Sequence, residues 1–227
     1  MTLSRRSFIG VTAAAVGALA AGTRVSAQNL SAADASGYRV QPLPFHPAKL
    51  NGISERLIVS HHDKNYAGAV RRLSAIQERI RQLPADSPPF QMGALKREEL
   101  IAMNSMILHE YYFENLGGDG KAAGNALDLI KQQFGSYEDW EHEFKLTGLS
   151  LSGGSGWVML SFSPHDTRVY NVWSSDHTQG LAAGKPLLVM DMYEHSYQMD
   201  YGADAKGYIQ AFFKNINWEA VQKRIEA

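Results

Sequence analysis

The sequence contains no cysteine. Disulfide bonds and thiolate metal ligands are therefore excluded, and a bound metal ion would be held by histidine, carboxylate, backbone or water ligands. These donors point to the harder ions. The sequence also lacks internal repeats and, outside its first residues, any tract of low complexity.

The chain has little net charge, with 22 lysines and arginines against 23 aspartates and glutamates. Residues 1–27 hold three of the arginines and no acidic residue, so 19 basic and 23 acidic side chains remain after them, a net charge of -4. Such a surface repels the phosphate backbone. We therefore expect no nucleic-acid partner.

The first 27 residues are typical of a targeting segment. Arg5 and Arg6 precede an Ala/Gly-rich apolar run from Phe8 to Ala21, which is too short and too weakly apolar to span a bilayer comfortably. Small residues at Val25–Ala27 form a cleavage site, and the whole resembles a twin-arginine export signal. We expect recognition by the twin-arginine machinery, cleavage after Ala27 and a periplasmic mature chain without stable membrane insertion. The alternative is an uncleaved membrane anchor.

Helical periodicity dominates the next part of the chain. We expect, in order, a flexible segment at 28–37, a proline-rich extended segment at 38–47, a helix at 53–83 that is either continuous or bent at Gly68, a loop at 86–93 and a helix at 95–116. Two helices joined by a short loop form an antiparallel hairpin. Residues 38–120 are therefore predicted to be an α-hairpin domain.

The remainder, residues 121–227, alternates helical and β-rich patterns. We expect helices at 123–134, 137–151, 205–215 and 218–226 and strands at 157–162, 168–173 and 187–192. The predicted fold class is α+β, with the hairpin followed by an α/β domain that contains a small three-stranded antiparallel sheet.

Four residues are candidate metal ligands. Asp191 ends an apolar run and precedes His195 by four residues, while His61 and His109 lie on the apolar faces of the two hairpin helices. A buried carboxylate needs a partner, and a metal ion would be one. Taken singly, each residue is better explained by an ordinary hydrogen bond or ion pair in the core.

Five motifs occur along the chain in a fixed order. They are Pro42-Leu43-Pro44-Phe45; Ile53-Ser54 with His61, His62 and Lys64; Gly153-Gly154-Ser155-Gly156-Trp157; Asp191 with Glu194, His195 and Tyr197; and Asn217-Trp218-Glu219. Together they resemble the iron/manganese superoxide dismutases over nearly the whole mature chain. The resemblance implies conversion of superoxide to oxygen and hydrogen peroxide.

The same resemblance assigns roles to residues. It implies one Fe or Mn ion per chain, held by the four candidate ligands His61, His109, Asp191 and His195. Tyr112 and Trp157 would wall the catalytic pocket. Glu194 would reach a ligand histidine of a partner subunit, in a homodimer or tetramer.

Several positions depart from the family pattern. A tyrosine, a histidine and a second tyrosine of the family are replaced by Ala69, Asn65 and Gln198, and an arginine by Gly202. The glutamine that would donate to metal-bound solvent is expected at Gly154 or Ser105, and neither can replace it. Tyr66 and His177 are possible substitutes, although packing or solvent exposure explains both more simply.

These departures keep two alternatives open. The first is an exported metal-binding protein on the same fold with altered or little dismutase activity. The second is a helical interaction module without metal.

The N-terminal pattern makes a direct prediction about export. Changing Arg5 and Arg6 to lysine should abolish export, and N-terminal sequencing of the exported wild type should begin near Gln28. Periplasmic wild-type protein that begins at Met1 would contradict the cleavage site.

Overall fold

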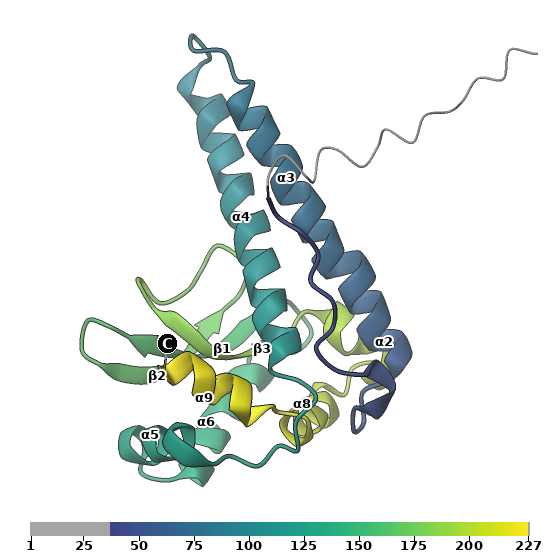
Figure 1. Cartoon of the computed structure of the whole chain (residues 1–227), viewed down its shortest axis with the longest axis vertical. Coiled ribbons are helices and arrows are strands. Elements are labelled where there is room, and N and C mark those ends of the chain that lie inside the picture. Colours follow the sequence, from purple (N-terminus) through teal and green to yellow (C-terminus); the bar gives the residue numbers. More distant parts are fainter. Residues whose placement is uncertain (1–36, 227) are drawn as a thin grey trace, which may run out of the picture.

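The computed structural model describes residues 37–226, so the expected export signal lies outside the described residues. A long helical hairpin rises from an α/β body in which helices surround a small sheet (Figure 1). This is the α+β architecture predicted from the sequence. Within residues 37–226, no helix is both long enough and apolar enough to cross a membrane.

The first arm of the hairpin consists of α2 (Glu55–Ser60), the π-helical turn η2 (His61–Tyr66) and α3 (Ala67–Arg81). Ser54 starts the arm, because its hydroxyl accepts a hydrogen bond from the Leu57 backbone N–H at 3.1 Å. The sequence left open a continuous helix or one bent at Gly68. In the structure the arm is continuous but changes helix type just before Gly68, over His61–Tyr66.

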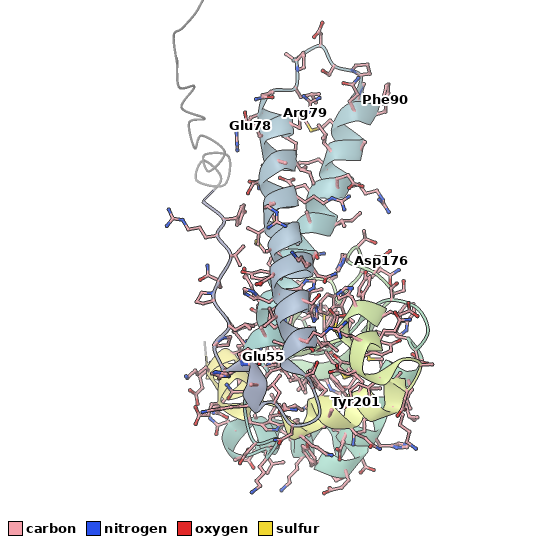
Figure 2. All side chains as sticks on the ribbon, turned by 90° about the vertical axis from the view of Figure 1, so that its right-hand side faces the viewer. Glu55, Glu78, Arg79, Phe90, Asp176 and Tyr201 are labelled. Atoms are coloured by element: carbon pink, nitrogen blue, oxygen red, sulfur yellow. The ribbon has the colours of Figure 1, made fainter. Side chains whose placement is uncertain are left out.

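The second arm is α4 (Pro89–Glu114), which starts six residues before the predicted Leu95. Five of the eight residues of the expected loop 86–93 are therefore helical. Proline is well tolerated in the first turn of a helix, where its missing N–H would have no helical partner. Phe90 lies at the tip of the hairpin, 73% exposed and far from the body (Figure 2), so the residues around it show no apolar stripe that would have predicted a helix.

The α/β half begins with α5 (Gly124–Phe134) and α6 (Tyr137–Leu149), close to the predicted bounds. The sheet has the order β2-β1-β3, and both pairings are antiparallel. The strands are β1 (Trp157–Ser163), β2 (Arg168–Ser174) and β3 (Lys185–Asp191). Two short helical turns, η3 (Glu194–Ser196) and α7 (Gln198–Tyr201), lead to α8 (Ala205–Lys214) and α9 (Trp218–Glu226).

Packing around the sheet places the end of β3 at the junction of the two halves. Helices α4 and α9 contact β3, and α6 contacts β1 and β2. Trp157, at the start of β1, is paired with Asp191, at the end of β3. Both side chains are fully buried.

A short turn, η1 (Pro47–Lys49), follows the expected extended segment near the other end of the hairpin.

Asn115 connects the hairpin to the α/β half. Its side-chain oxygen accepts a hydrogen bond from the Val189 N–H at 2.9 Å, and its backbone oxygen accepts one from the Asn217 N–H at 2.7 Å. Nearby, a Cβ on Gly118 would lie 2.2 Å from the Ile216 carbonyl oxygen, so only glycine permits this approach. The end of α4 is thereby fixed to the strand that carries Asp191.

This connection can be tested by removing the amide of the fully buried Asn115. In Asn115→Leu the Val189 N–H loses its partner, which should lower the free energy of unfolding by about 1 to 3 kcal/mol. Urea denaturation measures the change, with Asn125→Leu as the matched control because Asn125 is exposed. Equal stability of the two variants would show that the link contributes little.

Candidate metal centre

Four residues from four separate elements meet at one point. His61 begins the π-helical turn η2, His109 lies in the last two turns of α4, Asp191 ends β3 and His195 lies in η3. One nitrogen or oxygen atom of each lies within 4.8 Å of those of the others. The sequence predicted these four as ligands, and the structure brings all four together.

The distances between these atoms suit four donors gathered around one ion. Asp191 Oδ2 lies 3.1 Å from His61 Nε2, 3.7 Å from His109 Nε2 and 3.3 Å from His195 Nε2. All four atoms are buried and without a hydrogen-bond partner among the described residues. Leaving buried polar atoms unpaired is costly, so a cation that accepts all four lone pairs fits this arrangement.

Two backbone hydrogen bonds orient the ligands. His109 Nδ1 donates to the Ser105 carbonyl oxygen at 2.6 Å, which places the ring proton on Nδ1 and leaves the Nε2 lone pair free for a metal. Asp191 Oδ1 accepts from the Tyr193 N–H at 2.8 Å, so Oδ2 remains for the same ion. The fold therefore presets both the tautomer and the free oxygen.

Burial keeps two of the imidazoles neutral. His61 and His109 are each 1% exposed, and burial lowers the pKa of His61 and lowers the pKa of His109 to about 3. Burial opposes the charge of Asp191, but the neighbouring His195 and His61 outweigh it and lower the pKa of Asp191. A neutral imidazole and an ionised carboxylate are the forms that bind metal.

Aromatic rings enclose the cluster, including both residues expected to wall it. The Tyr112 ring centroid lies 5.1 Å from that of His61, and the Trp157 centroid lies 5.1 Å from that of His109. Both side chains have no exposed surface. The His195 side chain is 29% exposed, so its ring reaches the surface although its Nε2 atom is buried.

Two positions at which the family has a tyrosine carry no phenol here. Ala69 is buried, and Gln198 is exposed. Gly154 was one of the two positions expected to hold the solvent donor, but it is exposed and a Cβ there would approach only the Leu151 carbonyl oxygen, at 3.7 Å. Tyr66, a possible substitute, hydrogen-bonds to Glu110 and to the Gln41 N–H, at 2.8 and 2.9 Å.

His177, the other possible substitute, is partly buried and packs beside the candidate ligands. Its Nδ1 accepts a hydrogen bond from Trp157 Nε1 at 3.0 Å, and its ring stacks on Tyr193 with centroids 4.8 Å apart. Its centroid lies 6.5 Å from that of His109. Periodicity gave no sign of this placement, because it depends on how the loop between β2 and β3 returns across the sheet.

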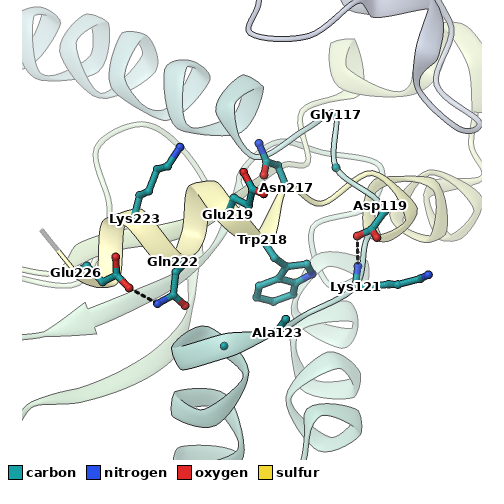
Figure 3. Close-up of a pocket in the computed structure, with 12 residues that line it drawn as sticks. Gly117, Asp119, Lys121, Ala123, Asn217, Trp218, Glu219, Gln222, Lys223 and Glu226 are labelled. Carbon is teal, nitrogen blue, oxygen red and sulfur yellow. Dashed lines mark hydrogen bonds between the residues drawn. The ribbon is translucent and has the colours of Figure 1, made fainter.

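A hollow of about 730 Å³ lies away from the candidate ligands, lined by the loop after α4 and by α9, including Trp218 (Figure 3). Its charged side chains are of both signs, and hydrogen bonds join Lys121 to Asp119 and Gln222 to Glu226. It contains none of the four candidate ligands, so its size does not mark the reactive site.

The fold and the site define a metalloprotein in which three imidazoles and one carboxylate surround a single cation position, a donor set suited to Fe or Mn. The C-terminal domain of iron/manganese superoxide dismutases matches residues 122–224.

Full-length relatives agree with this match. The chain is 52% identical over 191 residues to an iron superoxide dismutase of Cupriavidus metallidurans, covering 84% of this chain and 97% of the relative. It is 31% identical to manganese superoxide dismutase 1 of Halobacterium salinarum, covering 84% and 96%, and 32% identical to an iron superoxide dismutase of Aquifex aeolicus, covering 83% and 92%. The chain belongs to the iron/manganese superoxide dismutase family.

The lowered pKa of His109 predicts how the metal-free protein responds to acid. Between about pH 6.5, the usual histidine value, and about pH 3, the unfolded chain binds a proton at this residue that the folded chain does not. The contribution of His109 to the free energy of unfolding is therefore fully present above about pH 6.5. It decreases as the pH falls, by up to about 1.4 kcal/mol per pH unit. Urea denaturation of metal-free protein between pH 4.5 and 7.5 should show a shallower slope in His109→Gln. The exposed His142 supplies the control, and an unchanged slope in His109→Gln would refute the cause.

Proposed function

We propose that this chain dismutates superoxide to oxygen and hydrogen peroxide at one Fe or Mn ion per chain, bound by His61, His109, Asp191 and His195. The observation that carries the proposal is the set of four buried, unpartnered ligand atoms around one point. The ion would supply the one-electron chemistry, oxidising one superoxide and reducing the next, which zinc cannot do.

The role of the protein is to bind the ion and to exclude water from the site. The ligands carry a single negative charge, on Asp191, so they neutralise only part of the ion's charge and leave the pocket attractive to an anion. Tyr112 and Trp157 exclude water from two sides. The His195 ring reaches the surface, and a small anion such as superoxide would approach there.

His177 is suited to act as the donor that Ser105 and Gly154 lack. Because its Nδ1 accepts from the Trp157 indole N–H, a neutral His177 carries its proton on Nε2. That N–H is then available to a solvent molecule in the pocket. Donors beyond the ligands tune the potential and the proton affinity of a metal site, so His177 would perform the role of the absent glutamine.

A second function is favoured by the altered surroundings of the site. The small side chain of Ala69 and the exposed Gln198 remove two phenols from the pocket. An exported iron- or manganese-binding protein with little dismutase activity would need the four ligands and would not need those phenols. Turnover of metal-loaded protein separates the two functions.

The place of action is part of the proposal. The twin-arginine pattern at residues 1–27 supports a periplasmic protein. Because that export route carries folded proteins, the metal would be inserted before export.

Metal content and turnover test the main proposal together. Wild-type protein should bind one Fe or Mn per chain and dismutate superoxide, as measured by elemental analysis and pulse radiolysis. His109→Ala should lose most of the metal and the activity, whereas replacing the exposed His165 with alanine should change neither. A metal-loaded wild type without turnover would leave the metal-binding alternative, and full metal content in His109→Ala would remove that residue from the ligand set.

Glu194 tests the proposed homodimer. It is exposed, and its carboxylate makes no hydrogen bond or ion pair within residues 37–226, so it is free to reach the His195 ring of a second copy. Such a bond would hold that ring in orientation. Glu194→Ala should therefore weaken both dimerisation, measured by analytical ultracentrifugation, and metal retention. The exposed Glu138 is the control, and a fully metallated, stable Glu194→Ala dimer would exclude the bridge.

A further inference from the structure

The loop that carries His177 is anchored to the helical half of the protein by one side chain. Asn104, on α4, donates a hydrogen bond from its amide nitrogen to the His177 backbone oxygen at 2.6 Å. We propose that Asn104 is a positioning residue, which sets where the His177 ring lies relative to the metal ligands. This inference rests on the donor role proposed above for His177.

The residues of the loop, 174–179, are hydrogen-bonded to one another. The hydroxyl of Ser174 donates to the Asp176 backbone oxygen at 2.6 Å, and Asp176 Oδ1 accepts from the Thr178 N–H at 2.6 Å. Gln179 Oε1 accepts from the Ser175 N–H at 2.9 Å. With the segment 174–179 internally fixed, its placement depends on the few bonds that tie it to other elements.

Those outside bonds come from both halves of the protein. From the α/β half, the Ser155 hydroxyl donates to the Ser175 backbone oxygen at 2.8 Å, and the Trp157 indole donates to the His177 ring. From the helical half, Asn104 supplies the one hydrogen bond between α4 and the loop among the described residues. Figure 2 shows Asp176 of this loop beside the hairpin.

The position of Asn104 on α4 gives this bond its significance. Asn104 immediately precedes Ser105, whose backbone oxygen orients the ligand His109. One stretch of helix therefore fixes both the ligand imidazole and the backbone of His177, whose ring centroids lie 6.5 Å apart. Stacking on Tyr193 and the bond from Trp157 restrict the ring, but neither ties it to α4. Through Asn104, the same helix α4 holds both the ligand His109 and the backbone of His177, and it thereby sets the distance between their rings.

Loss of the amide should loosen the loop without removing the metal. Asn104 is only partly buried, and leucine has nearly the same shape, so Asn104→Leu should fold and bind Fe. In the metal-free chain, backbone amides of residues 175–178 should exchange hydrogen about 2- to 10-fold faster than in the wild type, the effect of losing about one net hydrogen bond. Asn125→Leu is the matched control.

The decisive measurement is the midpoint potential of the iron-loaded full chain. Asn104→Leu should shift it in the same direction as His177→Ala, and by less. In the double variant, Asn104→Leu should add no further shift, because the residue would act only through His177. The visible spectrum of the ferric protein should change in parallel.

Two results would overturn the assignment. One is a wild-type potential together with wild-type loop exchange in Asn104→Leu. The other is an equal shift from Asn104→Leu with and without His177, which would show action by another route. The potential does not depend on turnover, so a wild type that fails to dismutate superoxide would defeat the proposed function while this test of Asn104 still gives a definite answer.

Discussion

The convergence of four unpaired ligand atoms in a dry interior is the constraint on which the rest of the structure depends. Three imidazole nitrogens and one carboxylate oxygen face one point without a hydrogen-bond partner among the described residues. Such a group is unfavourable in the metal-free chain, since buried polar atoms need partners. Two ligands come from the hairpin and two from the α/β half, so the ion position exists only while the halves are held together.

Hydrogen bonds to the backbone orient the ligand side chains of His109 and Asp191. The bond from His109 to the Ser105 carbonyl and the bond from the Tyr193 N–H to Asp191 each engage the atom that the metal does not need. The Tyr208 hydroxyl also donates to the Asp191 backbone oxygen at 2.7 Å, which anchors the end of β3 to α8. Two of the four ligands, His109 and Asp191, are thus held in orientation by hydrogen bonds from the elements around them.

Local patterns in the sequence predicted most of the fold and marked four buried polar residues, whereas the family motifs were needed to assign those residues as one ligand set. The apolar faces around His61 and His109, and the apolar run that ends at Asp191, have the spacing of a helix and a strand. The start of α4 at Pro89 was missed because the tip of the hairpin packs against no core. His177 was named as a possible substitute donor, but its position could not be predicted because it depends on contacts between loop, sheet and helix. The exposure of Gly154 was not predicted for the same reason.

The π-helical turn at His61–Tyr66 has a consequence for how this chain can change in length. A π turn holds one residue more than an α turn, so the six residues here turn the chain by about as much as five residues of a regular α-helix would. The extra residue is therefore absorbed within the turn, and α2 and α3 keep the faces that they present to the body and to α4. A one-residue change inside α3 would instead rotate part of that helix by about 100° and turn packed residues toward solvent. Variation in length should therefore be tolerated at the tip of the hairpin, around Phe90, and at this turn, and rejected within α3.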